Sequence, residues 1–83
     1  MIRVLFFARI REQLGQDVLE VDAEGIDSLA GLQQALVERH GSAWGEILTA
    51  DNVLRAVNQC EADLDCPLRD GDEVAFFPPV TGG

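Results

Sequence analysis

Residues 70–83 read DGDEVAFFPPVTGG, and this stretch decides how the chain is expected to fold. Its first residues, Asp70-Gly71, are a signal for a tight turn, and the segment EVAFF that follows is predicted to be the last strand of a β-sheet. Pro78 and Pro79 end that strand, because proline has no N–H group to donate to a sheet ladder. The sequence therefore predicts a sheet that ends in a narrow C-terminal segment with no charged side chain.

Alternating apolar residues predict the other strands of this sheet. In the first strand, Ile2, Val4 and Phe6 share one face, and in an antiparallel second strand Leu19 and Val21 are expected to point inward. Each strand is expected to present an inward apolar set. The predicted strands cover residues 2–7, 17–22, 53–59 and 73–77, with one more short strand between 60 and 67.

One long amphipathic helix is predicted between the second and third strands. Its apolar residues recur at helical spacing: Leu29, Leu32, Leu36 and Val37. Asp27 or Ser28 can cap its start, and Gly41 supplies a stop. Shorter helical turns are predicted over 9–14 and 44–48.

A single helix covering one sheet gives an α+β fold, because every predicted strand needs its apolar face covered and only one long helix is available. The 83 residues suffice for one domain with a modest core. We expect that domain to span residues 1–77, followed by an extended tail over 78–83.

The charge balance limits the partners. Fifteen acidic and six basic residues give a net charge of −9, which would repel nucleic acid. The acidic surface either serves solubility or steers the chain toward basic partner proteins, and the two are compatible. All six basic residues are arginines, so no lysine side chain exists on which another carrier could be mounted.

Membrane insertion and secretion are not expected. No apolar run is long enough to cross a bilayer, and the opening MIRVLFFARI has none of the features of a signal peptide. A cytoplasmic location is therefore predicted.

No catalytic or metal site is expected in this chain. Cys60 and Cys66 are six residues apart and fit no known ligand spacing, so we expect reduced thiols, no metal and no bound cofactor. The chain also has no phosphate-binding loop and no general base beside a nucleophile. It is more readily understood as a substrate that enzymes hand to one another.

The C-terminal tail has the properties of such a substrate. Residues 78–83 reach about 20 Å when extended, far enough to enter another protein's active site. Gly82 and Gly83 have no Cβ atom, so a closely fitting channel can contact their backbone on all sides. The Gly83 carboxylate is ionised at neutral pH and has to be activated by another protein before it reacts. A disordered chain end is the alternative explanation for these residues.

Three stretches resemble the small subunits of molybdopterin synthases, which are sulfur-carrier proteins with the ubiquitin-like β-grasp fold. These stretches are VLFFARIRE (4–12), AVNQ (56–59) and PLRDGDEVAFFPPVTGG (67–83), and the last is the most specific. The resemblance runs nearly from end to end. It implies that the first and last strands are parallel neighbours, with Phe7 and Phe77 at the same end of the sheet.

The resemblance also implies a mechanism centred on Gly83. An adenylyltransferase related to ubiquitin activators would use ATP and magnesium to adenylate the carboxylate, and a sulfur donor would convert it to a thiocarboxylate. The large synthase subunit would supply the catalytic side chains while sulfur passes to a cyclic pyranopterin precursor, in a complex of two small and two large subunits. The residues implied in partner binding are Phe7, Phe77, Pro78, Pro79, Val80, Thr81 and Gly82.

Other functions share the same terminal chemistry. A sulfur carrier for thiazole synthesis or tRNA thiolation is one alternative, and a protein modifier that joins Gly83 to target lysines is another. A β-grasp ferredoxin is excluded, because two cysteines cannot supply four cluster ligands.

Overall fold

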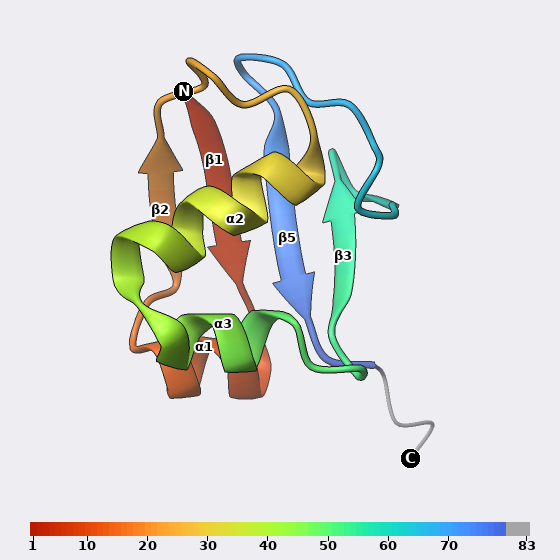
Figure 1. Ribbon diagram of the computed structural model, residues 1–83. Coiled ribbons are helices and arrows are strands. Elements are labelled where there is room, and N and C mark those ends of the chain that lie inside the picture. Colours follow the sequence, from red (N-terminus) through yellow and green to blue (C-terminus); the bar gives the residue numbers. More distant parts are fainter. Residues whose placement is uncertain (80–83) are drawn as a thin grey trace.

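Two parallel strands, β1 (Ile2–Phe6) and β5 (Glu73–Phe77), form the centre of the sheet in the computed structural model, which describes residues 1–79. β2 (Val18–Val21) pairs antiparallel with β1. β3 (Leu54–Val57) and then β4 (Cys60–Glu61) extend the sheet beyond β5, also antiparallel. The strand order is β2-β1-β5-β3-β4. Figure 1 shows the first four of these strands from left to right. The expected α+β fold and the parallel pairing of the first and last strands are both confirmed.

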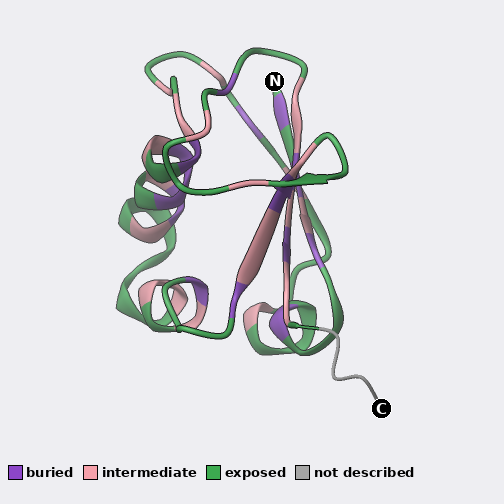
Figure 2. Cartoon of the chain, turned by 90° about the vertical axis from the view of Figure 1, so that its right-hand side faces the viewer, coloured by how far each residue is buried: buried purple, intermediate pink, exposed green. Residues whose placement is uncertain are grey.

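Three helices accompany the sheet within residues 1–79. The longest, α2 (Leu29–His40), covers one face, whereas α1 (Ala8–Leu14) and α3 (Ser42–Leu48) lie at the end where β1 and β5 finish (Figures 1 and 2). The short helical turns expected on either side of the main helix are therefore confirmed as α1 and α3.

The ends of α2 are those that the sequence predicts. The Ser28 hydroxyl oxygen accepts a hydrogen bond from the N–H of Gly31 at 3.1 Å, which satisfies one of the free donors of the first turn. Gly41 ends the helix with a φ of 100°, in the left-handed region that glycine adopts without strain.

The core lies between the sheet and α2. Alternate residues of the two central strands are fully buried there: Ile2, Val4, Phe6, Val74 and Phe76. They pack against Leu29, Leu32 and Leu36 of α2. Ile10 of α1 and Leu48 of α3 complete this cluster at the end of the sheet where β1 and β5 finish. The rings of Phe6 and Phe76 stack with centroids 5.7 Å apart, and Trp44 meets Phe6 edge-on at 5.5 Å. Burying each such side chain contributes about 1.5–3 kcal/mol, so this cluster holds both central strands in place.

Arg55 on β3 is half-buried and joins three elements. Its guanidinium group donates to Oε1 of Gln33 on α2 at 2.8 Å and to the carbonyl oxygen of Leu48 at 2.7 Å. It also lies over the Phe76 ring, 5.8 Å from the centroid. Gln33 is buried, and burial lowers the pKa of Arg55 from its usual value. The polar side chain of Gln33 is thus satisfied inside the core by a cation from the sheet.

The third strand ends earlier than predicted. β3 stops at Val57, and Asn58 and Gln59 form a two-residue turn with φ values of 50° and 72°. Positive φ at both positions gives a turn that matches the right-handed twist of a hairpin. The chain therefore turns at these two residues, although the alternating pattern predicts that the strand continues through them. The short β4 that follows has both residues exposed, contrary to the expectation of an inward apolar set on every strand. It pairs with the end of β3 alone among the described residues.

Hydrogen bonds connect this turn to the start of β5. The Asn58 amide donates to the Asp72 carboxylate at 3.0 Å, and the N–H of Arg69 donates to the same carboxylate at 2.8 Å. The first of these is the main reason that the pKa of Asp72 is lowered. Nearby, the amino group of Met1 pairs with the Asp70 carboxylate, and this hydrogen bond raises the pKa of the amine and lowers that of Asp70.

Within residues 1–79, no helix is long and apolar enough to span a membrane. The same residues contain no group of three or more His, Cys, Asp or Glu side chains arranged to hold a metal ion. Cys60 is exposed and Cys66 is half-buried, and both are free thiols.

Candidate functional site

The parallel pairing of β1 and β5 brings the two candidate contact aromatics to one end of the sheet. Phe6 is the register partner of Phe76, and the N–H of Phe7 donates to the Phe76 carbonyl oxygen at 3.1 Å. Because Phe6 and Phe76 point into the core, Phe7 and Phe77 lie on the opposite face of the sheet. Their predicted position at the same end is confirmed.

Phe7 is the more exposed of the two aromatics. Its side chain is 46% exposed, whereas Phe77 is half-buried. Phe7 stays extended at the N-cap of α1, with φ −120° and ψ 153°, and the chain turns only at the next residue. Ala8 makes that turn with a φ of 53°, which costs a non-glycine residue about 1–2 kcal/mol. The turn places α1 at the end of the sheet and leaves the Phe7 ring facing outward.

Two adjacent hollows border the point where the tail leaves β5. Each has a volume of about 300 Å³, and Arg9, Asn52 and Pro78 line both. The first is completed by Ile10, Gln13, Glu46, Ile47, Ala50 and Val53, and the second by Ala8 and Pro79. The walls come from α1, from α3 and from the loop before β3. Pro78 lies in the wall that the two hollows share, among both apolar and polar side chains.

Arg9 and Asn52 were not among the residues predicted from the sequence. They are separated by more than forty positions and belong to segments predicted only as a helical turn and as a turn before the third strand. Nothing in the local pattern of either segment connects them. Only the docking of α1 and α3 at one end of the sheet brings them together.

The side chains around Pro78 are of limited chemical variety in the described part of the chain. Its hollows are lined by no cysteine, serine or histidine. Cys60 is paired with Val57, which lies opposite Val74 at the start of β5 and therefore at the other end of the sheet.

Pro78 is half-buried and Pro79 is exposed, and both follow β5 without regular secondary structure. The remaining predicted site residues, Val80, Thr81, Gly82 and Gly83, lie outside the described residues. The predicted boundary between a domain over 1–77 and a tail over 78–83 stays a prediction.

The sequence is similar to those of several known proteins. The chain is 48% identical to the molybdopterin synthase sulfur carrier subunit of Escherichia coli, over 83 residues and the whole of both chains. It is 38% identical to small archaeal modifier protein 1 of Haloferax volcanii over 84 residues, covering 93% of this chain and 94% of that protein.

Solved structures agree with these relatives. The crystal structure of SAMP1 from Haloferax volcanii superposes with a TM-score of 0.82 at 30% identity, covering 99% of this chain and 98% of that one. A complex of subunits 1 and 2 of the molybdopterin-converting factor from Helicobacter pylori contains a chain that matches with a TM-score of 0.68 at 29% identity, covering 99% and 97%.

The family comparison covers nearly the whole sequence. The ThiS family model matches residues 4–83, from the first strand through the terminal glycines. The chain therefore belongs to the ThiS family, and its fold is the ubiquitin-like β-grasp of the sulfur carriers.

Proposed function

We propose that this chain is a sulfur carrier in molybdenum cofactor biosynthesis and acts in the cytoplasm. The observation that carries the proposal is the 48% identity, over the full length of both chains, to a molybdopterin synthase sulfur carrier subunit. The described site supports it, because the residues around Pro78 can present a tail but include no nucleophile. Gly83 is then the reacting residue: each transfer uses up the sulfur of its terminal thiocarboxylate and restores the carboxylate.

Activation begins at the Gly83 carboxylate. An adenylyltransferase of the ubiquitin-activator type, with ATP and magnesium, joins the carboxylate oxygen to AMP and releases pyrophosphate. Sulfide from a sulfur donor then attacks the acyl carbon and AMP leaves, which yields a terminal thiocarboxylate. Adenylation is needed because an ionised carboxylate has no good leaving group. The chain itself needs no bound cofactor for these steps.

Transfer requires a second partner, the large subunit of a molybdopterin synthase. In the Helicobacter pylori structure, a chain similar to this one belongs to a complex of subunits 1 and 2 of the molybdopterin-converting factor. The exposed ring of Phe7, with Phe77 and the prolines beside it, provides an apolar surface at the base of the tail. We propose that this surface docks on the large subunit while Val80–Gly82 occupy its channel, with two carriers and two large subunits in the complex. Each dithiolene takes sulfur from two carriers.

Intact-protein mass spectrometry tests the carrier chemistry. The chain is incubated with the adenylyltransferase, ATP, magnesium and a sulfur source, and one oxygen on Gly83 is expected to be replaced by sulfur. Deleting Gly83 abolishes the exchange. Gly82→Val folds normally but stalls, because a branched Cβ widens the chain inside the channel. An unchanged mass with all components present, or sulfur found on Cys60 or Cys66, contradicts the proposal.

A protein modifier is the second candidate, supported by the 38% identity to small archaeal modifier protein 1. It would use the same adenylate, with a lysine amine of a target protein in place of sulfide. Amide-linked adducts of the Gly83 carbonyl in cell extract support this function, whereas a free thiocarboxylate without adducts supports the carrier. A carrier for thiazole synthesis or tRNA thiolation is distinguished by which acceptor takes the sulfur from the purified thiocarboxylate.

A further inference from the structure

The outer edge of β2 offers unpaired backbone groups. Within residues 1–79, β2 pairs with β1 alone. The Phe6 N–H donates to the Asp17 carbonyl oxygen at 2.9 Å, and this fixes which residues of β2 face β1. The N–H and C=O groups of successive residues in a strand point to opposite sides, so those of Leu19 and Val21 face β1, as those of Asp17 do. Those of Val18 and Glu20 therefore point away from the sheet.

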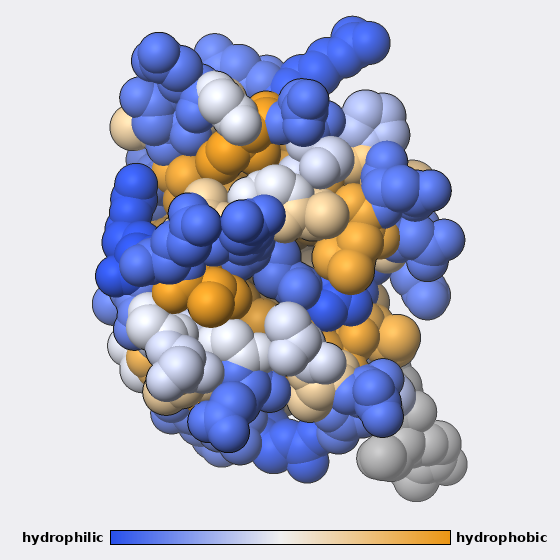
Figure 3. All heavy atoms as spheres, viewed as in Figure 1, coloured by the Kyte–Doolittle hydropathy of each residue, from blue (hydrophilic) through white to orange (hydrophobic). Residues whose placement is uncertain are grey.

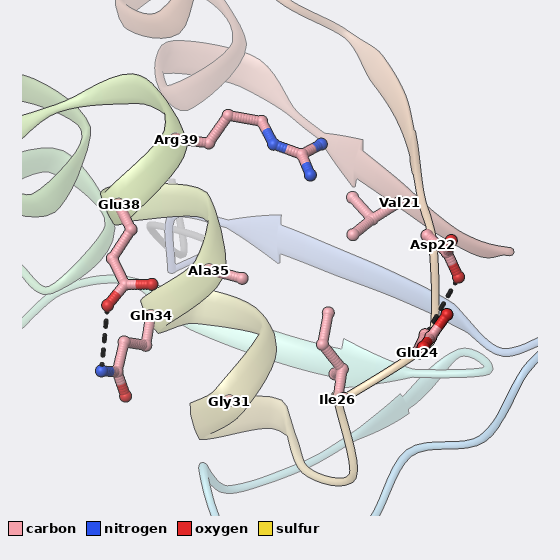
Figure 4. A pocket seen from close by; sticks show the side chains of 10 residues that line it. Val21, Asp22, Glu24, Ile26, Gly31, Gln34, Ala35, Glu38 and Arg39 are labelled. Atoms are coloured by element: carbon pink, nitrogen blue, oxygen red, sulfur yellow. Dashed lines mark hydrogen bonds between the residues drawn. The ribbon is translucent and has the colours of Figure 1, made fainter.

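A hollow continues this edge where β2 ends. It has a volume of about 660 Å³ and lies between the segment that follows β2 and the outer side of α2 (Figure 4). It is lined by Val21, Asp22, Glu24, Gly25, Ile26, Gly31, Gln34, Ala35, Glu38 and Arg39. Figure 3 shows apolar surface on this face of the molecule, beside α2 and bordered by hydrophilic side chains. We call the outer edge of β2 together with this hollow the β2 groove.

The hollow exists because α2 presents small residues to it. Gly31 and Ala35 are four positions apart, so they lie one above the other on the same side of the helix. A Cβ atom built on Gly31 would meet only the Ser28 hydroxyl oxygen, at the ordinary contact distance of 3.5 Å. Opposite them, the side chains of Val21 and Ile26 point toward the helix and give the hollow an apolar floor (Figure 4).

The rim of the hollow is acidic. It carries three carboxylates, Asp22, Glu24 and Glu38, and one guanidinium group, Arg39. None of the three carboxylates is in an ion pair, since the structure of residues 1–79 has a single ion pair, between Met1 and Asp70. Asp22 accepts a hydrogen bond from the Glu24 N–H at 3.0 Å, and Glu38 accepts one from the Gln34 side-chain amide at 3.3 Å (Figure 4). Each carboxylate still has lone pairs to offer a basic partner, and the net charge of −9 adds to the attraction.

We propose that the β2 groove binds an extended, basic segment of a partner protein, which adds to the sheet as a sixth strand beside β2. Backbone hydrogen bonds to Val18 and Glu20 hold the segment, and one of its apolar side chains enters the hollow. Lysine or arginine residues next to that side chain meet Asp22, Glu24 and Glu38. This interaction is separate from sulfur transfer and does not depend on it.

The hollow of the β2 groove and Pro78 lie at opposite ends of the sheet. Val21 is the register partner of Ile2, at the start of β1, whereas Phe7 and Pro78 follow the ends of β1 and β5 (Figure 1). The outer edge of β2 is also separated from β5 by β1, so a partner seated in the β2 groove leaves Pro78 uncovered. The chain can therefore be held by one protein while its tail is used by another.

The test uses the full chain labelled with ¹⁵N and a short synthetic peptide of alternating lysine and valine, with blocked ends. We expect the peptide to shift the amide resonances of Val18 and Glu20 and those around the hollow. Ala35→Arg fills the hollow with a side chain of the same positive charge as the peptide's lysines, and we expect it to weaken binding about tenfold. Ala30→Arg is the matched control, because Ala30 is an exposed residue of α2 outside the hollow, and it should leave binding nearly unchanged.

Two further comparisons separate strand addition from general attraction to an acidic protein. The same peptide with alternate backbone amides N-methylated keeps its charge but cannot form a ladder, and it should no longer bind. Val18→Pro removes an outward N–H at the first residue of an edge strand, where proline is tolerated, and should weaken the unmodified peptide. Equal binding of the methylated peptide, equal effects of Ala35→Arg and Ala30→Arg, or shifts confined to other acidic surfaces would overturn the proposal.

Discussion

Phe6 and Phe7 are neighbours in the sequence, and the same substitution is expected to have opposite consequences at the two positions. Phe6 is 1% exposed, stacks on Phe76 and meets Trp44 edge-on, whereas Phe7 is 46% exposed at the end of the sheet. Phe6→Ala therefore tests the core, and Phe7→Ala tests the surface proposed to dock on the large subunit.

The sizes of the two effects follow from burial. Truncating a buried phenylalanine in a core costs about 3–5 kcal/mol, because transfer energy is lost and a cavity remains. For Phe7, about half of the side chain is already in solvent, so the loss is about 1 kcal/mol. At an interface, an aromatic anchor contributes about 2 kcal/mol or more, which is about thirtyfold in Kd.

Urea denaturation followed by circular dichroism measures the free energy of unfolding of each variant. Calorimetric titration with the purified large subunit measures its Kd. We expect Phe7→Ala to remain folded and to bind weakly, and Phe77→Ala to behave in the same direction with a larger loss of stability. If Phe7→Ala destabilises the fold as much as Phe6→Ala, Phe7 belongs to the core. Unchanged affinity for the large subunit would show that the exposed ring is not part of the docking surface.

Three further predictions concern the fold. Arg55→Met should lower the unfolding free energy by about 2 kcal/mol, and adding Gln33→Leu should restore about half of this, because neither buried polar partner is then left alone; additive losses in a double-mutant cycle would disprove the coupling. Gln59→Gly should stabilise by about 0.5–1 kcal/mol by relieving a φ of 72°, whereas Gln34→Gly in α2 should destabilise by about 1 kcal/mol, both measured by thermal unfolding. Asp72 has a lowered pKa in the folded state, so its contribution to the free energy of unfolding is present above the ordinary pKa of 3.8 and is lost as the pH falls through the folded-state pKa. Asp72→Asn should therefore make the free energy of unfolding depend less on pH in the acid range. An unchanged dependence would contradict this.

The central strands and the main helix could be predicted from the sequence because their burial follows strict periods. Ile2, Val4 and Phe6 alternate in sequence and are buried in the structure, and Ser28 caps α2 as a serine before an apolar helical pattern should. The parallel pairing of β1 and β5 was expected only from the resemblance. A single strand pattern does not state which neighbour the strand will have.

Other features depend on residues that meet only after folding. Gln33 is polar, and its burial could not be expected without knowing that Arg55 reaches it from β3. The hollows around Pro78 combine α1, α3 and a loop, and no spacing in the sequence records that meeting. Asn58 and Gln59 were assigned to a strand because their positive φ values are not signalled by a glycine.

The position of β5 between β1 and β3 determines how the domain responds to a pull on its C-terminal end. Hydrogen bonds hold β5 along both sides, from the Arg3 N–H bonded to the Asp72 carbonyl oxygen at its start to the Phe7 N–H bonded to the Phe76 carbonyl oxygen at its end. A force along the strand axis loads all of these bonds together in shear, and β5 has a ladder on each side to resist it, whereas an edge strand has a ladder on one side. A partner that draws the residues after Pro79 into its own interior is therefore expected to move the whole domain as one rigid body without unravelling it.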